Sequence, residues 1–189
     1  GLYLVKLGGP WILVIGIVSI AAALGYTNGP IPYGYYGLGE LFVFVFFGLV
    51  ATAGTRFVFD RTLESGAWVG GVAMGLLASA ILLANNIRDI ETDATADKRT
   101  LAVIVGRRNA VLLYAGCVLG GVLTSAVGVA FDWLPAPTLL TLLTLPIALP
   151  LVRRLQHEVS GPPLIRVLKG TARLQLLVAL LLSAGILIA

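Results

Sequence analysis

Four residues with oxygen-bearing side chains recur at every fourth position of the stretch NNIRDIETDATADKRT, which occupies positions 85–100. They are Asn85, Asp89, Asp93 and Asp97. On an α-helix a step of four residues advances about 400°, so each side chain lies one turn beyond the last and about 40° around the axis. The spacing therefore predicts a ladder of oxygen atoms along one helix face, which we call the oxygen ladder.

Like charges at this spacing repel each other by about a few tenths of a kcal/mol per pair, and a bound cation would offset that repulsion. Mg²⁺ prefers oxygen ligands and is typically held by one or two carboxylates together with substrate phosphates. Three cationic side chains beside the ladder could contact the remaining phosphate oxygens: Arg88, Lys98 and Arg99. The residues alone leave two interpretations open, a site for Mg²⁺ and a diphosphate, or a cluster of ion pairs at the end of a membrane helix.

The elements that must position this stretch are membrane-spanning helices. Of the 189 residues, 58% are hydrophobic and 12% are charged, and the mean hydropathy of +0.98 lies above the range of soluble domains. Lipid offers no partners to free backbone groups, and the apolar runs are long and continuous, which favours helices over a barrel. We expect a single all-α domain, a multi-pass transmembrane helical bundle with spans at 10–26, 41–58, 66–84, 110–131, 138–152 and 171–189.

The distribution of Lys and Arg predicts which side of the membrane holds the charged stretch, because cytoplasmic loops retain these residues. The predicted loops 92–108 and 153–169 are both rich in Lys and Arg. We therefore expect both on the cytoplasmic side of the cell (inner) membrane. The segment TNGPIPYGYYGLG, at 27–39, joins them there by parity. The net charge of +4 belongs to loops beside spans and does not indicate nucleic acid.

The stretch NNIRDIETDATADKRT resembles the second aspartate-rich motif of the UbiA superfamily of intramembrane prenyltransferases. The segment DKRTLAVIVGRRNA resembles the MenA branch of that family, the 1,4-dihydroxy-2-naphthoate polyprenyltransferases, and so does PYGYYGLGELFVFVFFGLVATAGT at 32–55. The resemblance covers the whole chain. It implies that the six spans correspond to the last six helices of a nine-helix fold.

The resemblance implies a reaction. Family members bind a polyprenyl diphosphate through Mg²⁺ and two aspartate-rich motifs, ionise it to an allylic cation, and let an electron-rich aromatic acceptor attack the cation. In this branch the acceptor, 1,4-dihydroxy-2-naphthoate, loses its carboxyl group to give demethylmenaquinone for menaquinone biosynthesis. The residues carried over are the metal ligands Asp89, Asp93 and Asp97 and the diphosphate contacts Asn85, Arg88, Lys98 and Arg99.

The segment PYGYYGLGE supplies the other candidate catalytic residues, and each has a structural alternative. Tyr33, Tyr35 and Tyr36 could present π faces to the allylic cation, an attraction worth about 0.5–2 kcal/mol. They could equally be aromatic residues of the membrane interface. Glu40 could deprotonate or orient the acceptor hydroxyl, or could be a helix-start carboxylate favoured by the macrodipole. The branch has an acidic residue at this position, which favours a functional role for Glu40.

The chain departs from the family pattern in one respect. The first aspartate-rich motif, of the form Asn-x-x-x-Asp-x-x-x-Gly, is absent, and so are the three spans expected to carry it. We expect that the chain lacks its first three helices, that it needs them in the same polypeptide or as a companion chain, and that it is inactive alone. Two alternatives are a UbiA-type enzyme with another aromatic acceptor such as 4-hydroxybenzoate and, more distantly, a non-catalytic membrane subunit or transporter.

Overall fold

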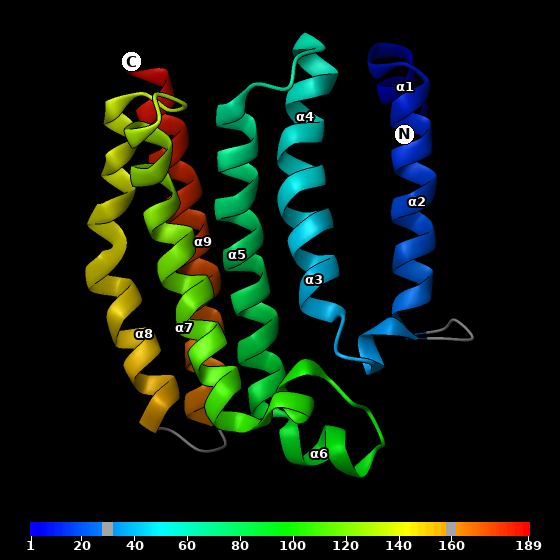
Figure 1. Cartoon of the computed structure of the whole chain (residues 1–189), viewed down its shortest axis with the longest axis vertical. Helices are drawn as coiled ribbons and strands as arrows, with labels where there is room; N and C mark the ends of the chain where they lie inside the picture. Colours follow the sequence, from blue (N-terminus) through cyan, green and yellow to red (C-terminus); the bar gives the residue numbers. More distant parts are fainter. Residues whose placement is uncertain (28–31, 158–161) are drawn as a thin grey trace.

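A computed structural model describes residues 1–27, 32–157 and 162–189, and these residues form helices and no strand (Figure 1). Six helical segments are long and apolar enough to cross a membrane, as predicted. They are α2 (Pro10–Thr27), α3 to α4 (Gly39–Asp60), α5 (Ser65–Arg88), α7 (Leu101–Ala130), η3 with α8 (Ala136–His157) and α9 (Pro162–Leu187).

Three of these segments change their geometry along their length, and one of them, α7, is broken at Gly106 (φ 76°, ψ 158°). The segment from 39 to 60 consists of α3 (Gly39–Val43), the π-helix η2 (Phe44–Val50) and α4 (Ala51–Asp60). The segment from 136 to 157 begins as the 3₁₀-helix η3 (Ala136–Thr144) and continues as α8 (Leu145–His157). Three short helices complete the described chain: α1 (Leu2–Gly8), η1 (Tyr33–Tyr35) and α6 (Ile90–Thr95).

The predicted bounds of the fourth and sixth spans are wrong at their amino-terminal ends. The predicted starts are 110 and 171, whereas α7 begins at Leu101 and is interrupted at Gly106 (φ 76°, ψ 158°), and α9 begins at Pro162. The predicted loops 92–108 and 153–169 are therefore partly helical. Residues 158–161 of the second loop lie outside the described part, as do residues 28–31 of the segment 27–39. Hydropathy marks only the lipid-embedded part of a helix, and Lys and Arg are good helix formers that extend it into the aqueous phase.

Helix α5 is the central element of the bundle. It packs against α3, η2 and α4 on one side and against α7 and α9 on the other (Figure 1). Leu77, Ala80 and Leu83 of α5 are almost fully buried. By contrast, α2 has no buried residue and stands apart from α3 and α4. The position of the charged stretch, which follows α5 directly, is therefore set by the best-packed helix of the chain.

Glycines permit the close approach of α5 and η2. A Cβ atom added to Gly48 of η2 would lie 2.4 Å from the Cα of Gly75 and 2.6 Å from the carbonyl oxygen of Gly71. Close helix contacts through small residues are characteristic of membrane proteins. Gly71 and Gly75 thus serve the close packing of α5 and η2. Gly116 of α7 differs, because no described atom lies within 4 Å of a Cβ added there.

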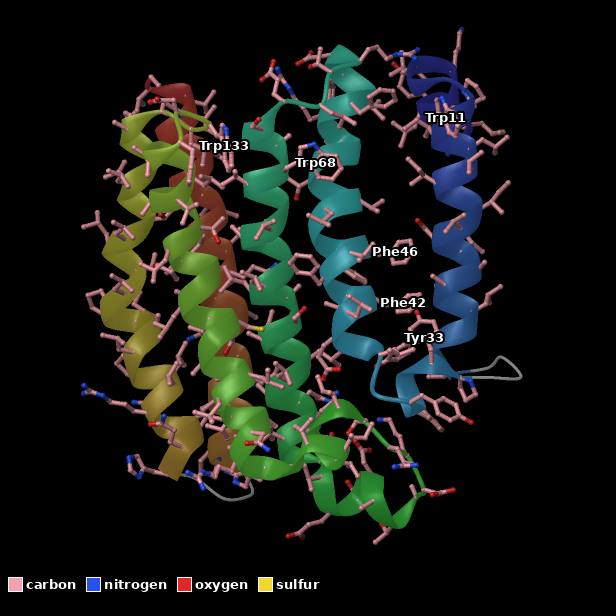
Figure 2. All side chains as sticks on the ribbon, viewed as in Figure 1. Trp11, Tyr33, Phe42, Phe46, Trp68 and Trp133 are labelled. Carbon is pink, nitrogen blue, oxygen red and sulfur yellow. The ribbon has the colours of Figure 1, made fainter. Side chains whose placement is uncertain are left out.

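The two ends of the bundle differ in their side chains. Figure 2 shows Trp11, Trp68 and Trp133 near one end and Tyr33 near the other. The helix α6 and the charged stretch lie at the Tyr33 end (Figure 1). Tryptophan is enriched where a membrane meets water, so the tryptophans indicate the membrane boundary opposite the charged end.

We predict that Gly48→Ala lowers the stability of the protein by about 1–3 kcal/mol, because the added methyl group must displace backbone atoms of α5. The measurement is the midpoint of thermal unfolding in detergent micelles. Gly116→Ala is the matched control, because it adds the same methyl group to a helix where no atom is in contact. An equal effect of both substitutions would contradict the assignment.

Candidate active site at the charged end of the bundle

The continuous oxygen ladder predicted from the four-residue spacing is wrong. Helix α5 ends at Arg88, and Asp89, with φ −99° and ψ 10°, joins it to the short helix α6. After α6 the chain turns again at Asp97, whose φ of 54° is left-handed. The four residues therefore do not share one helix face.

Local hydrogen bonds accompany both breaks. The carbonyl oxygen of Asp89 accepts from the Thr92 hydroxyl at 2.9 Å as well as from the Asp93 amide at 2.8 Å. The Lys98 amide donates to the carbonyl oxygen of Asp93 at 2.9 Å and closes the turn through Asp97. Aspartate tolerates the left-handed conformation better than most residues. The side chain of Asp97 is consequently exposed.

The first half of the stretch forms one polar cluster. The Arg88 guanidinium donates to both carboxylate oxygens of Asp89, at 2.7 and 2.6 Å, and to Asn85 Oδ1 at 3.0 Å. Asn85 Nδ2 in turn lies 3.4 Å from Asp89 Oδ2. The structure thus brings together three predicted site residues, and here the carboxylate is paired with a cation of the protein. This arrangement corresponds to the ion-pair interpretation of the stretch.

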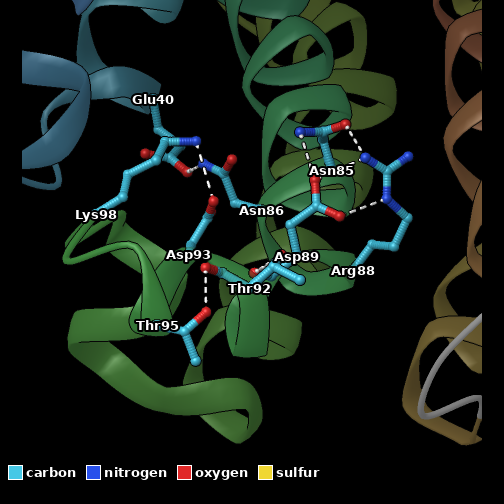
Figure 3. A network of polar contacts seen from close by, with 9 residues as sticks. All are labelled: Glu40, Asn85, Asn86, Arg88, Asp89, Thr92, Asp93, Thr95 and Lys98. Atoms are coloured by element: carbon cyan, nitrogen blue, oxygen red, sulfur yellow. Dashed lines mark hydrogen bonds and ion pairs between the residues drawn. The ribbon is translucent and has the colours of Figure 1, made fainter.

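A second polar cluster lies beside the first at the end of α5 (Figure 3). We call it the Glu40 cluster, and it consists of Glu40, Asn86, Asp93 and Lys98. Lys98 Nζ lies 3.2 Å from Asp93 Oδ1 and 5.8 Å from the centre of the Tyr35 ring, a cation–π geometry. Asn86 Nδ2 donates to Glu40 Oε1 at 2.9 Å. The cluster therefore joins the PYGYYGLGE segment to the charged stretch, the two segments that supply the candidate residues.

Three buried side-chain oxygens in the described part of the chain have no hydrogen-bond partner: Glu40 Oε2, Asp93 Oδ2 and Thr100 Oγ1. Glu40 is 7% exposed and Asp93 is 8% exposed. An unsatisfied buried oxygen costs about 1–3 kcal/mol, so such atoms in a native structure mark strain, an absent ligand or a catalytic role. Two of the three belong to the Glu40 cluster, which makes this cluster the best candidate for a site.

The predicted tyrosines have different surroundings. The Tyr33 ring stacks on Phe42 with centroids 3.9 Å apart, and its hydroxyl donates to the carbonyl oxygen of Ala22 at 2.6 Å. Burial raises the pKa of Tyr33, with a smaller contribution from the neighbouring Tyr26. Tyr35 faces Lys98, whereas Tyr36 is 56% exposed. Tyr35 therefore contacts the Glu40 cluster, whereas Tyr33 packs against the aromatic residues Tyr26 and Phe42.

An apolar groove opens beside this site, between α2 and the segment that follows η1. Its volume is about 600 Å³. Tyr26, Tyr33 and Gly39 line its polar end, and Phe42 and Phe46 continue the aromatic wall toward the middle of the bundle (Figure 2). Gly39 of this lining precedes Glu40 in the chain, so the polar end of the groove lies near the Glu40 cluster, whose side chains do not line it.

The sequence interpretation missed Asn86. The four-residue spacing selected its neighbour Asn85, and nothing local indicated that the side chain of Asn86 meets a residue 46 positions away. The structure also separates the predicted metal ligands. In the ranges 1–27, 32–157 and 162–189, no three acidic, His or Cys side chains are grouped to hold a metal ion.

Comparison with known proteins adds a family and several relatives. Residues 1–162 match the UbiA prenyltransferase family. The chain is 43% identical over 190 residues to the 1,4-dihydroxy-2-naphthoate octaprenyltransferase of Mycobacterium tuberculosis, covering 98% of the chain and 63% of the relative. The proteins of the same name from Escherichia coli (36% over 174 residues, covering 92% and 56%) and Bacillus subtilis (31% over 195 residues, covering 100% and 60%) are also similar. The chain thus spans less than two thirds of the length of these curated relatives.

We predict that Lys98→Met lowers the stability of the protein by about 1–3 kcal/mol, because it leaves the buried Asp93 carboxylate without its cationic partner. The measurement is the midpoint of thermal unfolding in detergent. Arg99→Met removes a neighbouring exposed cation and should change stability by less than about 0.5 kcal/mol. Lys98→Arg, which keeps the charge, should fall between the two, and equal effects of Lys98→Met and Arg99→Met would refute the role of the pair.

Proposed function

Because the chain belongs to the UbiA prenyltransferase family, we propose that it transfers a polyprenyl group from a polyprenyl diphosphate to 1,4-dihydroxy-2-naphthoate. The acceptor would lose its carboxyl group, and the product would be demethylmenaquinone, for menaquinone biosynthesis. The names of the three relatives support this choice of acceptor. Since the chain spans only part of their length, the proposed activity is that of the full-length protein.

The observation that carries the proposal is the pair of unpartnered oxygens, Glu40 Oε2 and Asp93 Oδ2, in one buried cluster. An enzyme that binds a metal diphosphate and an acidic hydroxyl needs oxygen acceptors of this kind. Three cations would serve the diphosphate oxygens: Lys98, which pairs with Asp93, Arg99, which follows Lys98 in the chain, and Arg88 at the end of α5. The cluster therefore combines acceptor atoms for two substrates with counter-charges for one of them.

Magnesium fits this donor set. Asp93 has a carboxylate oxygen without a partner among the described residues, and hard divalent cations prefer such ligands. When bound, Mg²⁺ would offset the negative charge that develops on the leaving diphosphate. Asp89 could join as a ligand if the diphosphate took over its partner Arg88, and Asp97, which is exposed, would contribute least. The described carboxylates form no group of three. We therefore propose that the family's first aspartate-rich motif supplies the remaining ligands. That motif would lie in helices that precede these six, in the same or a companion chain.

The remaining residues are assigned to the two organic substrates. The apolar groove beside Tyr33 would hold the first part of the prenyl chain, and the rings of Tyr33 and Tyr35 would face the developing allylic cation. Glu40 Oε2 would accept a hydrogen bond, or the proton, from an acceptor hydroxyl, which raises the electron density of the aromatic ring. A carbon–carbon bond then forms as the donor's carbon–oxygen bond breaks, and diphosphate and carbon dioxide leave.

The proposed site faces the cytoplasm, with the protein in the cell (inner) membrane. Two observations support this orientation. The charged end of the bundle carries the clustered Lys and Arg residues, which cytoplasmic loops retain. The opposite end carries the tryptophans (Figure 2). A cytoplasmic site would receive both water-soluble groups, the diphosphate and the naphthoate carboxylate, from the aqueous side.

We predict that Asp93→Asn in the full-length protein lowers prenyl transfer by at least about 100-fold, because it removes the charge that the proposed cation requires. Transfer is measured as demethylmenaquinone formed from polyprenyl diphosphate and 1,4-dihydroxy-2-naphthoate. Glu91→Gln, an exposed carboxylate of α6 outside the cluster, is the matched control and should keep at least half of the activity. Full activity of Asp93→Asn would reject the assignment.

We also predict that removal of divalent metal abolishes transfer. Treatment of the purified full-length protein with a chelator should lower the rate by at least about 100-fold, since a Lewis-acidic cation contributes several kcal/mol of charge stabilisation. Adding Mg²⁺ back should restore the rate. Persistent turnover in protein that elemental analysis shows to be free of magnesium would refute the proposed cofactor.

A further inference from the structure

Helix α5 holds Glu40 at two points. Asn86 Nδ2 donates to the carboxyl oxygen Oε1 at 2.9 Å, and the Ser79 hydroxyl donates to the backbone carbonyl of Glu40 at 2.9 Å. Asn86 is 3% exposed and Ser79 is 4% exposed. Two buried hydrogen bonds to one residue, from a helix 39 and 46 positions further along the chain, indicate that the placement of Glu40 is tightly specified.

The geometry of α5 explains why Asn86 rather than Asn85 has this role. Residues 79 and 86 are separated by about two helical turns and therefore lie on the same face. Asn85 is rotated by about 100° from Asn86, and its side chain contacts Arg88 and Asp89 instead. Figure 3 shows the two asparagines directed into the two separate polar clusters.

The hydrogen bond from Asn86 differentiates the two oxygens of the Glu40 carboxyl group. The amide nitrogen of Asn86 can only donate a hydrogen bond, and it donates to Oε1. Another donor cannot approach Oε1 from the direction that Asn86 occupies. Oε2 is left buried and has no partner in the part of the chain that the structure describes. Holding one oxygen by a donor in a packed helix fixes the rotamer of the carboxyl group, and with it the direction in which Oε2 points.

We propose that Asn86 is a positioning residue, which orients the Glu40 carboxyl group so that Oε2 meets the hydroxyl of the aromatic acceptor. This inference rests on the proposed function, in which Glu40 contacts that hydroxyl. Asn86 itself touches neither substrate. Its effect on transfer therefore passes entirely through Glu40, and this distinguishes it from a residue that only stabilises the fold.

A double-mutant cycle tests this dependence, since coupling between two sites appears as non-additivity. The variants are Asn86→Leu, Glu40→Gln and the double variant in the full-length protein, assayed with polyprenyl diphosphate and 1,4-dihydroxy-2-naphthoate. We expect Glu40→Gln to lower kcat/KM for the acceptor by about 100-fold and Asn86→Leu to lower it by about tenfold, with KM for the donor unchanged in both. The double variant should match Glu40→Gln, because without the carboxylate there is nothing for Asn86 to orient.

The other outcomes separate the two levels of the argument. If the two losses multiply in the double variant, or if Asn86→Leu has no more effect than the exposed control Asn109→Leu, the inference is wrong while the proposed function stands. If Glu40→Gln retains full activity, the proposed role of Glu40 fails and the inference fails with it.

Stability provides a second readout that holds even if Asn86→Leu folds poorly. Asn86→Asp is nearly the same size but replaces the donor with a carboxylate that faces Glu40, and it should lower the thermal midpoint. In the Glu40→Gln background the new side-chain amide can donate a hydrogen bond to the new carboxylate, so Asn86→Asp should be far less destabilising there. Equal destabilisation in both backgrounds would overturn the contact on which the inference depends.

Discussion

The close packing of α5 against η2 is the contact on which the rest of the site depends. Gly48 meets the backbone of Gly71 and Gly75, and no side chain larger than hydrogen fits between the two helices. Glu40 lies in α3, which continues directly into η2, and Ser79 and Asn86 of α5 donate hydrogen bonds to it beside this close approach. Lipid tails are as apolar as the side chains, so there is no hydrophobic driving force between helices in a membrane. Packing of small residues and interhelical hydrogen bonds are therefore the main sources of specific helix contacts.

A second constraint acts at the end of α5, where the chain leaves the packed bundle. The segment 85–100 contains four acidic and three basic side chains, and the breaks at Asp89 and Asp97 prevent the carboxylates from lying in a row. Arg88 and Lys98 each neutralise one carboxylate. The charges are thereby kept in partly buried pairs beside the membrane, and the pairing leaves one oxygen of Asp93 available to a ligand.

The fold could be predicted from the sequence because the physics that determines it is local. Continuous apolar runs can only be helices in lipid, so the six spans follow from composition and length alone. The errors lie at the ends of spans. At Pro162 the helix continues through polar residues, and at Leu101 a short helical segment precedes the break at Gly106. The gathering of the PYGYYGLGE and NNIRDIETDATADKRT segments at one end of the bundle also followed from the sequence, through the alternation of spans and loops.

The sequence by itself determined the number of spans, the charged end and the kinds of residue available for chemistry. Only the tertiary structure decided which of these residues meet. The partnership of Asn86 with Glu40 depends on an approach between helices distant in sequence, and the exposure of Asp97 depends on one left-handed residue. Periodicity describes the repeat of a single helix, so it carries no information about a partner on another helix or about the point at which the repeat is interrupted.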